Sequence, residues 1–148
     1  MGIELPSDFK EFLRLLNAHQ VEYLVIGGYA VSFHGYPRAT NGFDIWVALN
    51  PDNAQKLVVT LEAFGFSVPE LTPLLFQKPD QIIRMGSPPI RIELHTGISG
   101  LVFEECYPSR LIVPMDGVLV QLISLSDLRK NKRANGRHKD LSDLEYLP

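Results

Sequence analysis

Residues 21–48 read VEYLVIGGYAVSFHGYPRATNGFDIWVA and contain two short apolar segments separated by a glycine-rich turn. Val21–Ile26 is a mainly apolar run that predicts a buried strand. Gly27 and Gly28 follow it at once, and the residues after them have the spacing of a short helix. Phe43–Ala48 predicts a second strand, whose alternate residues face opposite sides of a sheet. The stretch therefore predicts a strand, a tight turn, a short helix and a second strand, in that order.

The remaining sequence predicts further helices and strands on both sides of this stretch. Predicted helices cover about 7–20, 51–64 and 139–147, with another that is capped by Ser124 or Ser126 and ends near Ala134. Predicted strands cover 81–85, 90–95, 111–113 and 118–122, and residues 67–80 are expected to be largely irregular. This order predicts an α/β (α+β) fold with a central mixed β-sheet flanked by helices, in a single domain that covers residues 1–148.

The composition excludes several classes of protein. With 45% hydrophobic residues and a net charge of −3 over 148 residues, the chain is too apolar and too weakly charged to be intrinsically disordered. Its apolar runs are too short to cross a membrane, and its single cysteine, Cys106, excludes an intrachain disulfide or a cysteine zinc cluster. The first residues lack the basic start and apolar centre of a signal peptide, so we expect a cytoplasmic protein without membrane association.

The basic residues are concentrated in one segment. Arg129–Lys139 reads RKNKRANGRHK and contains six of the 14 basic residues but none of the 17 acidic ones, which leaves the rest of the chain at −9. Such a segment indicates a surface for phosphate or nucleic acid. A solvated helix face has the same pattern, and the charges alone do not decide between the two.

The glycine turn and two of the predicted strands together resemble a known family. Asp44 lies on the strand that follows the glycine turn, and a later strand carries Arg91, Glu93 and His95 on one face. This arrangement resembles the nucleotidyltransferase superfamily, whose fold is shared with DNA polymerase β. The pattern of that family is a Gly-Gly or Gly-Ser turn, an Asp-x-Asp pair on the next strand and a third carboxylate on a later strand. Residues Asn131–Leu147 look like the ending of short single-domain bacterial members, which include relatives of toxin–antitoxin and abortive-infection nucleotidyltransferases.

The resemblance implies a nucleotidyltransferase-like fold, a reaction and a set of site residues. The reaction is Mg²⁺-dependent transfer of a nucleoside monophosphate from a nucleoside triphosphate to a hydroxyl of a small molecule, a protein or RNA. Asp44 and Glu93 match two of the three metal-binding carboxylates of the family and are the implied catalytic residues. The implied nucleotide-binding residues are Gly27, Gly28, Arg38, Lys130, Arg133, Arg137 and Lys139.

The sequence departs from the family pattern at one metal-binding position. Gly42 stands where the family has its first aspartate, and glycine has no side chain with which to bind a metal. If one such ligand contributes about 3–4 kcal/mol to the transition state, its loss slows the reaction about 10²–10³-fold. Restoring aspartate at position 42 is expected to raise activity or Mg²⁺ affinity if the rest of the site is intact.

Three interpretations of Gly42 stay open. The chain is an inactive relative that keeps the fold, or it acts with one metal or a borrowed carboxylate, or the glycine is a variant of an active parent. An inactive relative would be a binding module for a nucleotide, for RNA or for a protein partner. Two candidate side chains also have plainer explanations: Arg38 as the partner of a nearby acid, and His95 as a bystander on a polar strand face.

Overall fold

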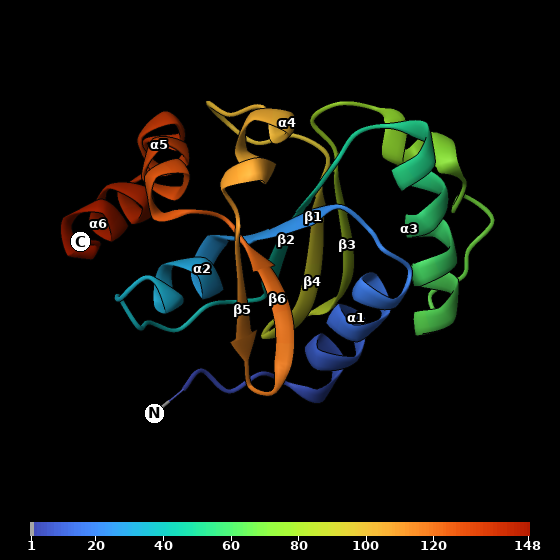
Figure 1. Cartoon of the computed structure of the whole chain (residues 1–148), viewed down its shortest axis with the longest axis horizontal. Helices are drawn as coiled ribbons and strands as arrows, with labels where there is room; N and C mark the ends of the chain where they lie inside the picture. Colours follow the sequence, from blue (N-terminus) through green and yellow to red (C-terminus); the bar gives the residue numbers. More distant parts are fainter. Residues whose placement is uncertain (1) are drawn as a thin grey trace.

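Six strands form one mixed sheet in the computed structural model of the chain, which describes residues 2–148 (Figure 1). The strands are β1 (Tyr23–Ile26), β2 (Phe43–Val47), β3 (Ile82–Ser87), β4 (Ile90–His95), β5 (Leu111–Met115) and β6 (Val118–Leu122). Their order across the sheet is β3-β4-β2-β1-β6-β5. Strand β2 is antiparallel to β1 and parallel to β4, so the sheet is mixed, as the sequence predicts.

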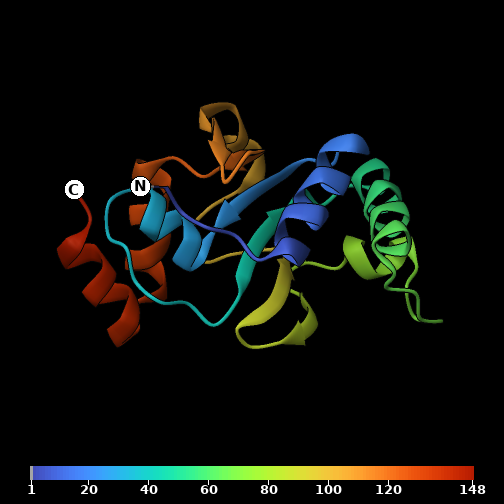
Figure 2. The same cartoon turned by 90° about the horizontal axis from the view of Figure 1, so that it is seen from below.

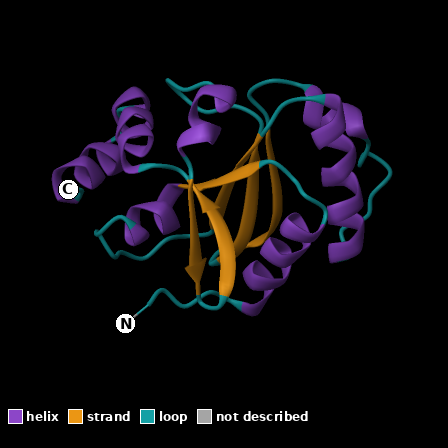
Figure 3. Ribbon diagram, viewed as in Figure 1, coloured by secondary structure: helices purple, strands orange, loops and turns teal. Residues whose placement is uncertain are grey.

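Helices flank this sheet on two sides. They are α1 (Ser7–Ala18), α2 (Gly27–Phe33), α3 (Pro51–Phe64), α4 (Phe103–Cys106), α5 (Leu125–Asn135) and α6 (His138–Tyr146), with two short 3₁₀ helices, η1 (Pro73–Gln77) and η2 (Tyr107–Ser109). Helices α1 and α3 lie together at one side of the sheet, and α2, α5 and α6 lie at the other (Figure 2 and Figure 3). Among residues 2–148, no helix is both long enough and apolar enough to cross a membrane.

The boundaries of the elements agree with the sequence-based prediction within two residues. The side-chain oxygen of Asn50 caps α3 by accepting a hydrogen bond from the N–H of Asn53 at 2.8 Å. Ser124 caps α5 in the same way, through the N–H of Asp127 at 3.2 Å. The clearest difference is β3, which continues through Ser87 because the hairpin to β4 is tighter than the sequence indicates.

One apolar core fixes which face of the central strands is free for polar side chains. Phe43 of β2 stacks on Phe9 of α1, with ring centroids 4.9 Å apart. Ile45 of β2 and Leu94 of β4 are fully buried on the same side. Because alternate strand residues point to opposite faces, the intervening polar residues of β2 and β4 point away from this core. The apolar pattern thus places the polar side chains of both strands on one surface.

A buried network of ion pairs joins α5, α6 and the loop before β2. Lys132 of α5 is almost fully buried, and its Nζ lies 3.1 Å from Oδ1 of Asp140 and 3.0 Å from Oδ2 of Asp143. Arg38, in the loop before β2, donates two hydrogen bonds to Asp143, from Nε at 2.7 Å and from Nη2 at 2.8 Å. Arg137 donates from Nε to Asp140 at 2.7 Å. Asp140 and Asp143 of α6 are therefore each shared between two cations.

These cations keep the two buried carboxylates charged. Burial opposes the ionisation of Asp140, but hydrogen bonds from Arg137 and Lys132 hold its pKa below the ordinary value. Burial likewise opposes the ionisation of Asp143, and hydrogen bonds from Arg38 and Lys132 lower its pKa. The network therefore holds α6 against α5 at neutral pH.

We expect Lys132→Ala to lower the free energy of unfolding by about 3 kcal/mol, the lower end of the range for removing one partner of a buried ion pair. The lower end applies because Arg38 and Arg137 still neutralise the two carboxylates. Urea unfolding followed by circular dichroism measures the change. The matched control is Lys130→Ala, an exposed cation on the same helix, which should change stability by less than about 0.5 kcal/mol. Equal losses in the two variants would contradict the proposed importance of the network.

The same network predicts sensitivity to acid. The folded pKa values of Asp140 and Asp143 lie below the ordinary value of 3.8, so their contribution to stability is complete above that pH. It is lost as the pH falls from 3.8 through the lower folded values. Urea unfolding over a series of pH values should show a smaller acid loss in Lys132→Ala than in the unaltered chain. Parallel pH profiles would argue against this assignment.

Candidate functional site

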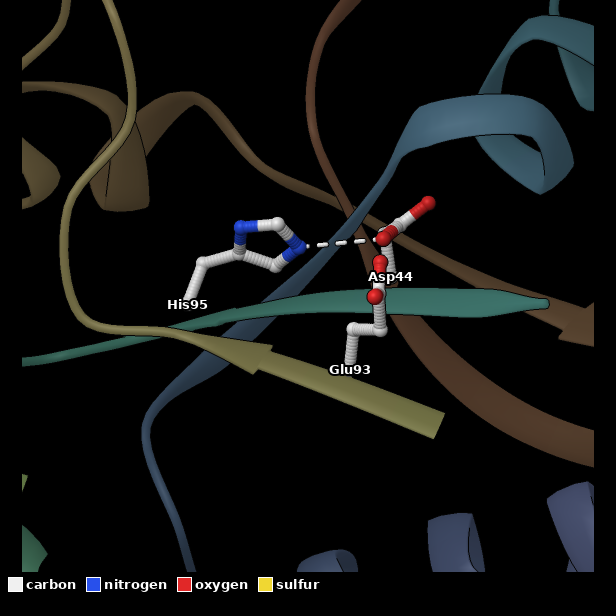
Figure 4. Close-up of side chains that lie close together, drawn as sticks. All are labelled: Asp44, Glu93 and His95. Carbon is white, nitrogen blue, oxygen red and sulfur yellow. Dashed lines mark hydrogen bonds and ion pairs between the residues drawn. The ribbon is translucent and has the colours of Figure 1, made fainter. Parts of the chain in front are cut away.

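Three polar side chains meet where β2 lies beside β4. Asp44 of β2 pairs in register with Glu93 of β4, and His95 follows two residues later on the same face of β4. The Nε2 atom of His95 lies 3.0 Å from Oδ1 of Asp44, and ligand atoms of all three side chains lie within 4.8 Å of one another (Figure 4). All three are half-buried and line a cavity of about 710 Å³. We call these three residues the Asp44 cluster.

Neighbouring charges keep the aspartate of this cluster ionised. Burial raises the pKa of Asp44, but the hydrogen bond and charge of His95, followed by a hydrogen bond with Glu93, hold it below the ordinary value. Glu93 is itself paired with two arginines, because its Oε2 accepts a hydrogen bond from Nε of Arg84 at 2.6 Å and lies 3.5 Å from Nε of Arg91. The cluster therefore combines an ionised aspartate, an arginine-paired glutamate and an imidazole.

Gly27 and Gly28 lie at the edge of the same cavity, and close contacts explain both glycines. Gly27 has a φ of +69°, and a Cβ atom at this position would collide with Oδ2 of Asp44. A Cβ atom on Gly28 would lie 2.6 Å from Oγ1 of Thr40. The absence of side chains at the turn therefore lets Asp44 and Thr40 approach the backbone.

Gly42 also has a packing reason to be glycine. It lies in a bend just before β2, and a Cβ atom there would be 2.5 Å from the main-chain oxygen of Arg91 in β4. That separation is well inside van der Waals contact, whose optimum for carbon atoms is about 3.5–4.0 Å. An aspartate at position 42 therefore requires the backbone of β4 to move. The expectation that Gly42→Asp simply restores a metal ligand conflicts with this contact.

Another wall of the large cavity is basic. Lys132, Arg137 and Lys139, from α5, α6 and the turn between them, line it together with the Asp44 cluster. Lys132 and Arg137 are already paired with carboxylates of α6. Lys139 is exposed and forms no ion pair with any residue of the described part of the chain, 2–148. After burial, His95 and Glu93, its positive charge is a further influence on the pKa of Asp44, which it lowers.

The other expected nucleotide-binding residues lie elsewhere. Arg38 is bound to Asp143 and lines a second, smaller cavity of about 330 Å³, which Lys139 also lines. Lys130 and Arg133 are exposed on α5 and line neither of these two cavities. Arg38 is thus the partner of an acid, the plainer explanation that its sequence context allows.

The sequence patterns do not predict the contacts of two residues that line the large cavity. The spacing of His95 from Glu93 predicts that both lie on one strand face, and the structure adds that the imidazole contacts Asp44, which differs from the bystander interpretation. Lys132 is one of several cations in the basic segment, and only the packing of α5 against α6 shows which of them is buried.

The side chains present do not match a centre for two Mg²⁺ ions. Such a centre needs carboxylates that bridge both ions, and position 42 supplies no ligand and has no room for a side chain. Asp44 and Glu93 supply oxygen ligands of the kind that one Mg²⁺ accepts. His95 adds a nitrogen ligand of the kind that transition metals bind. The chemistry of the donor set therefore fits one cation and not two.

Comparison with solved structures identifies the fold. An antigenic nucleotidyltransferase-like protein from Paracoccidioides brasiliensis superposes on this chain with a TM-score of 0.55 and 18% sequence identity. The match covers 96% of this chain and 76% of that protein. No protein-family model matches the sequence, and no curated protein matches it significantly. The chain therefore has a nucleotidyltransferase-like fold, which confirms the fold that the sequence resemblance implies.

We expect Gly42→Ala and Gly42→Asp each to lower the free energy of unfolding by about 1–3 kcal/mol, the usual effect of overpacking. Both variants add the Cβ atom that meets the oxygen of Arg91, so the two losses should be similar. Urea unfolding measures stability, and calorimetric titration of Mg²⁺ shows whether the new carboxylate adds affinity. If Gly42→Asp is as stable as the unaltered chain and binds Mg²⁺ more tightly, the overpacking prediction is wrong, and the aspartate side chain alone completes the metal site.

Gly27→Ala is expected to be more destabilising than Gly65→Ala, although both glycines have positive φ values, +69° and +98°. Both substitutions strain the backbone by about 1–3 kcal/mol. Only Gly27→Ala also meets Asp44, since nothing lies within 4 Å of a Cβ atom on Gly65. The difference between the two variants in urea unfolding should be at least about 1 kcal/mol. Equal losses would mean that Asp44 does not need the space at Gly27.

Proposed function

We propose that this chain binds the phosphates of a nucleoside triphosphate in the large cavity, and that nucleotidyl transfer to a hydroxyl acceptor is strongly impaired or lost. The observation that carries the proposal is that one cavity is lined by the Asp44 cluster, by Gly27 and Gly28, and by Lys139, a cation without an ion-pair partner among residues 2–148. A cavity of about 710 Å³ is within the range of small-molecule sites. The fold supports the same class of ligand, since its solved neighbour is described as nucleotidyltransferase-like.

Lys139 and Arg137 are the residues that we propose to bind the phosphates. Lys139 has no carboxylate partner among residues 2–148, so its ammonium group is available to an anion. The Arg137 side chain is 68% exposed despite its bond to Asp140, and a guanidinium has further N–H groups that suit phosphate oxygens. Lys132 is too fully engaged by Asp140 and Asp143 to take a ligand, and it serves to position α6.

We propose that nucleotidyl transfer is impaired because few metal ligands are available near position 42. Displacement at phosphorus is assisted by two metal ions that stabilise the attacking and leaving oxygens. Gly42 lacks the bridging carboxylate of the family pattern, and Glu93 is already paired with Arg84 and Arg91. A loss of about 3–4 kcal/mol of transition-state stabilisation corresponds to a rate about 10²–10³-fold lower. Nucleotide binding without efficient transfer is therefore the function that these side chains support best.

The proposal also includes a second ligand, which is a macromolecule. A chain that binds a nucleotide without transferring it acts as a binding module, with a protein or RNA as its second ligand. The exposed cations Lys130 and Arg133, which lie outside both cavities, are available for an RNA phosphate. The relation to short bacterial members and to toxin–antitoxin proteins stays a prediction.

The test is calorimetric titration of ATP, GTP, CTP and UTP into the chain without added metal. Lys139→Ala should bind the preferred triphosphate about 10–150-fold more weakly, because one charge-assisted contact contributes about 1.5–3 kcal/mol. Lys130→Ala is the matched control, since this lysine lies in the same basic segment but lines neither cavity. The Lys130→Ala variant should bind the triphosphate as tightly as the unaltered chain does. Equal affinity in the two variants, or no binding of any triphosphate, would overturn the proposal.

A further inference from the structure

We infer that Asp44, Glu93 and His95 form a site for a single transition-metal cation, of which Zn²⁺ is the representative, in place of a pair of Mg²⁺ ions. This inference deepens the proposed function and rests on it, because the cation would lie in the cavity that is proposed to bind the triphosphate. It concerns the identity and the number of the metal ions. It assigns to His95 a role that the carboxylate pattern of the sequence does not contain.

The spacing of the ligand atoms suits a small four-coordinate cation. Zinc binds histidine nitrogen and carboxylate oxygen at about 2.0–2.2 Å, which places the ligands of a tetrahedral site about 3.3–3.6 Å apart. The Nε2 atom of His95 already lies 3.0 Å from Oδ1 of Asp44. The three ligand atoms all lie within 4.8 Å of one another. Side-chain rotations that move these atoms by about an ångström would therefore let all three bind one metal ion.

The chemistry of the ligands favours a transition metal over Mg²⁺. Mg²⁺ is bound by oxygen and demands near-ideal octahedral geometry, whereas imidazole is a common ligand of Zn²⁺ and related ions. A set of two carboxylates and one histidine has three protein ligands, the number that leaves a fourth position open for water or a phosphate oxygen. Lys139 lines the same cavity as the three ligands.

Strand pairing in the sheet positions the three ligand residues independently of a metal ion. Asp44 and Glu93 are neighbours because β2 and β4 pair in register, and His95 lies beside Trp46 in the same ladder. Arg84 and Arg91 contact Oε2 of Glu93, which directs this carboxylate and leaves Oε1 as the oxygen that we assign to the metal. These arginines are outer partners of a metal ligand, a kind of contact that orients ligands in metal sites.

The first experiment is calorimetric titration of Zn²⁺ and Mg²⁺ into the full chain without nucleotide. One Zn²⁺ should bind per chain, at least about 100-fold more tightly than Mg²⁺. His95→Gln should weaken Zn²⁺ binding by at least about 100-fold, because even the loss of an outer partner costs about 10–100-fold in metal affinity. His138→Gln is the matched control, since this histidine is exposed and does not line the cavity. Unchanged Zn²⁺ affinity in His95→Gln, or Mg²⁺ binding as tight as Zn²⁺ binding, would overturn the inference.

A second measurement keeps His95 in place, so it does not depend on the folding of His95→Gln. The chain has four histidines, and ¹H–¹⁵N spectra of their imidazole rings should show a metal-induced shift at the Nε2 of one ring only. Substituting His19, His34 and His138 by glutamine in turn assigns the remaining ring to His95. A shift in several rings, or in none, would show that Zn²⁺ binds only adventitiously.

The same variants separate failure of this inference from failure of the proposed function. Lys139→Ala should lose triphosphate affinity in metal-free buffer and keep its Zn²⁺ affinity, because Lys139 is not a ligand. His95→Gln should show the reverse. Zn²⁺ binding without any triphosphate binding would support the metal site and contradict the proposed nucleotide binding. Triphosphate binding without Zn²⁺ binding would support the proposed function and contradict the metal site.

Discussion

The parallel pairing of β2 with β4 is the constraint on which the candidate site depends. This register places Asp44 beside Glu93 and brings His95 within 3.0 Å of the aspartate. A slip of one residue would turn the polar side chains of a strand into the core and its apolar ones into the cavity. The burial of Phe43 and Leu94 opposes such a slip. The core and the site are therefore two consequences of one strand register.

Two glycines show how closely the backbone is fitted around this register. Gly27 leaves space for the carboxylate of Asp44, and Gly42 leaves space for the main-chain oxygen of Arg91. Position 42 therefore has a packing role, because the path of β4 uses the room that a side chain would need. The cavity that results has oxygen and nitrogen ligands on one wall and a basic wall from α5 and α6.

The basic wall is positioned by buried charge. Lys132 lies between Asp140 and Asp143, and Arg38 and Arg137 bind the outer sides of the same carboxylates. Buried ion pairs of this kind add little net stability when complete, but removing one partner leaves an uncompensated charge. Their role here is to hold α6 in place, so that Lys139, which has no acidic partner within residues 2–148, lines both cavities.

The sequence by itself determined the helices and the strands, because apolar periodicity, capping residues and glycines act over a few residues. The resemblance to the nucleotidyltransferase superfamily singled out Asp44 and Glu93 as predicted metal ligands. The same resemblance predicted that Gly42 stands at the position of a metal ligand. Tertiary structure alone decided which cations of the basic segment are buried, that Arg38 binds Asp143, and that His95 joins Asp44. These contacts join residues 51 to 105 positions apart in the chain, or depend on how α5 packs against α6. Short-range sequence patterns do not predict such contacts, since the partners meet only when strands align and helices pack.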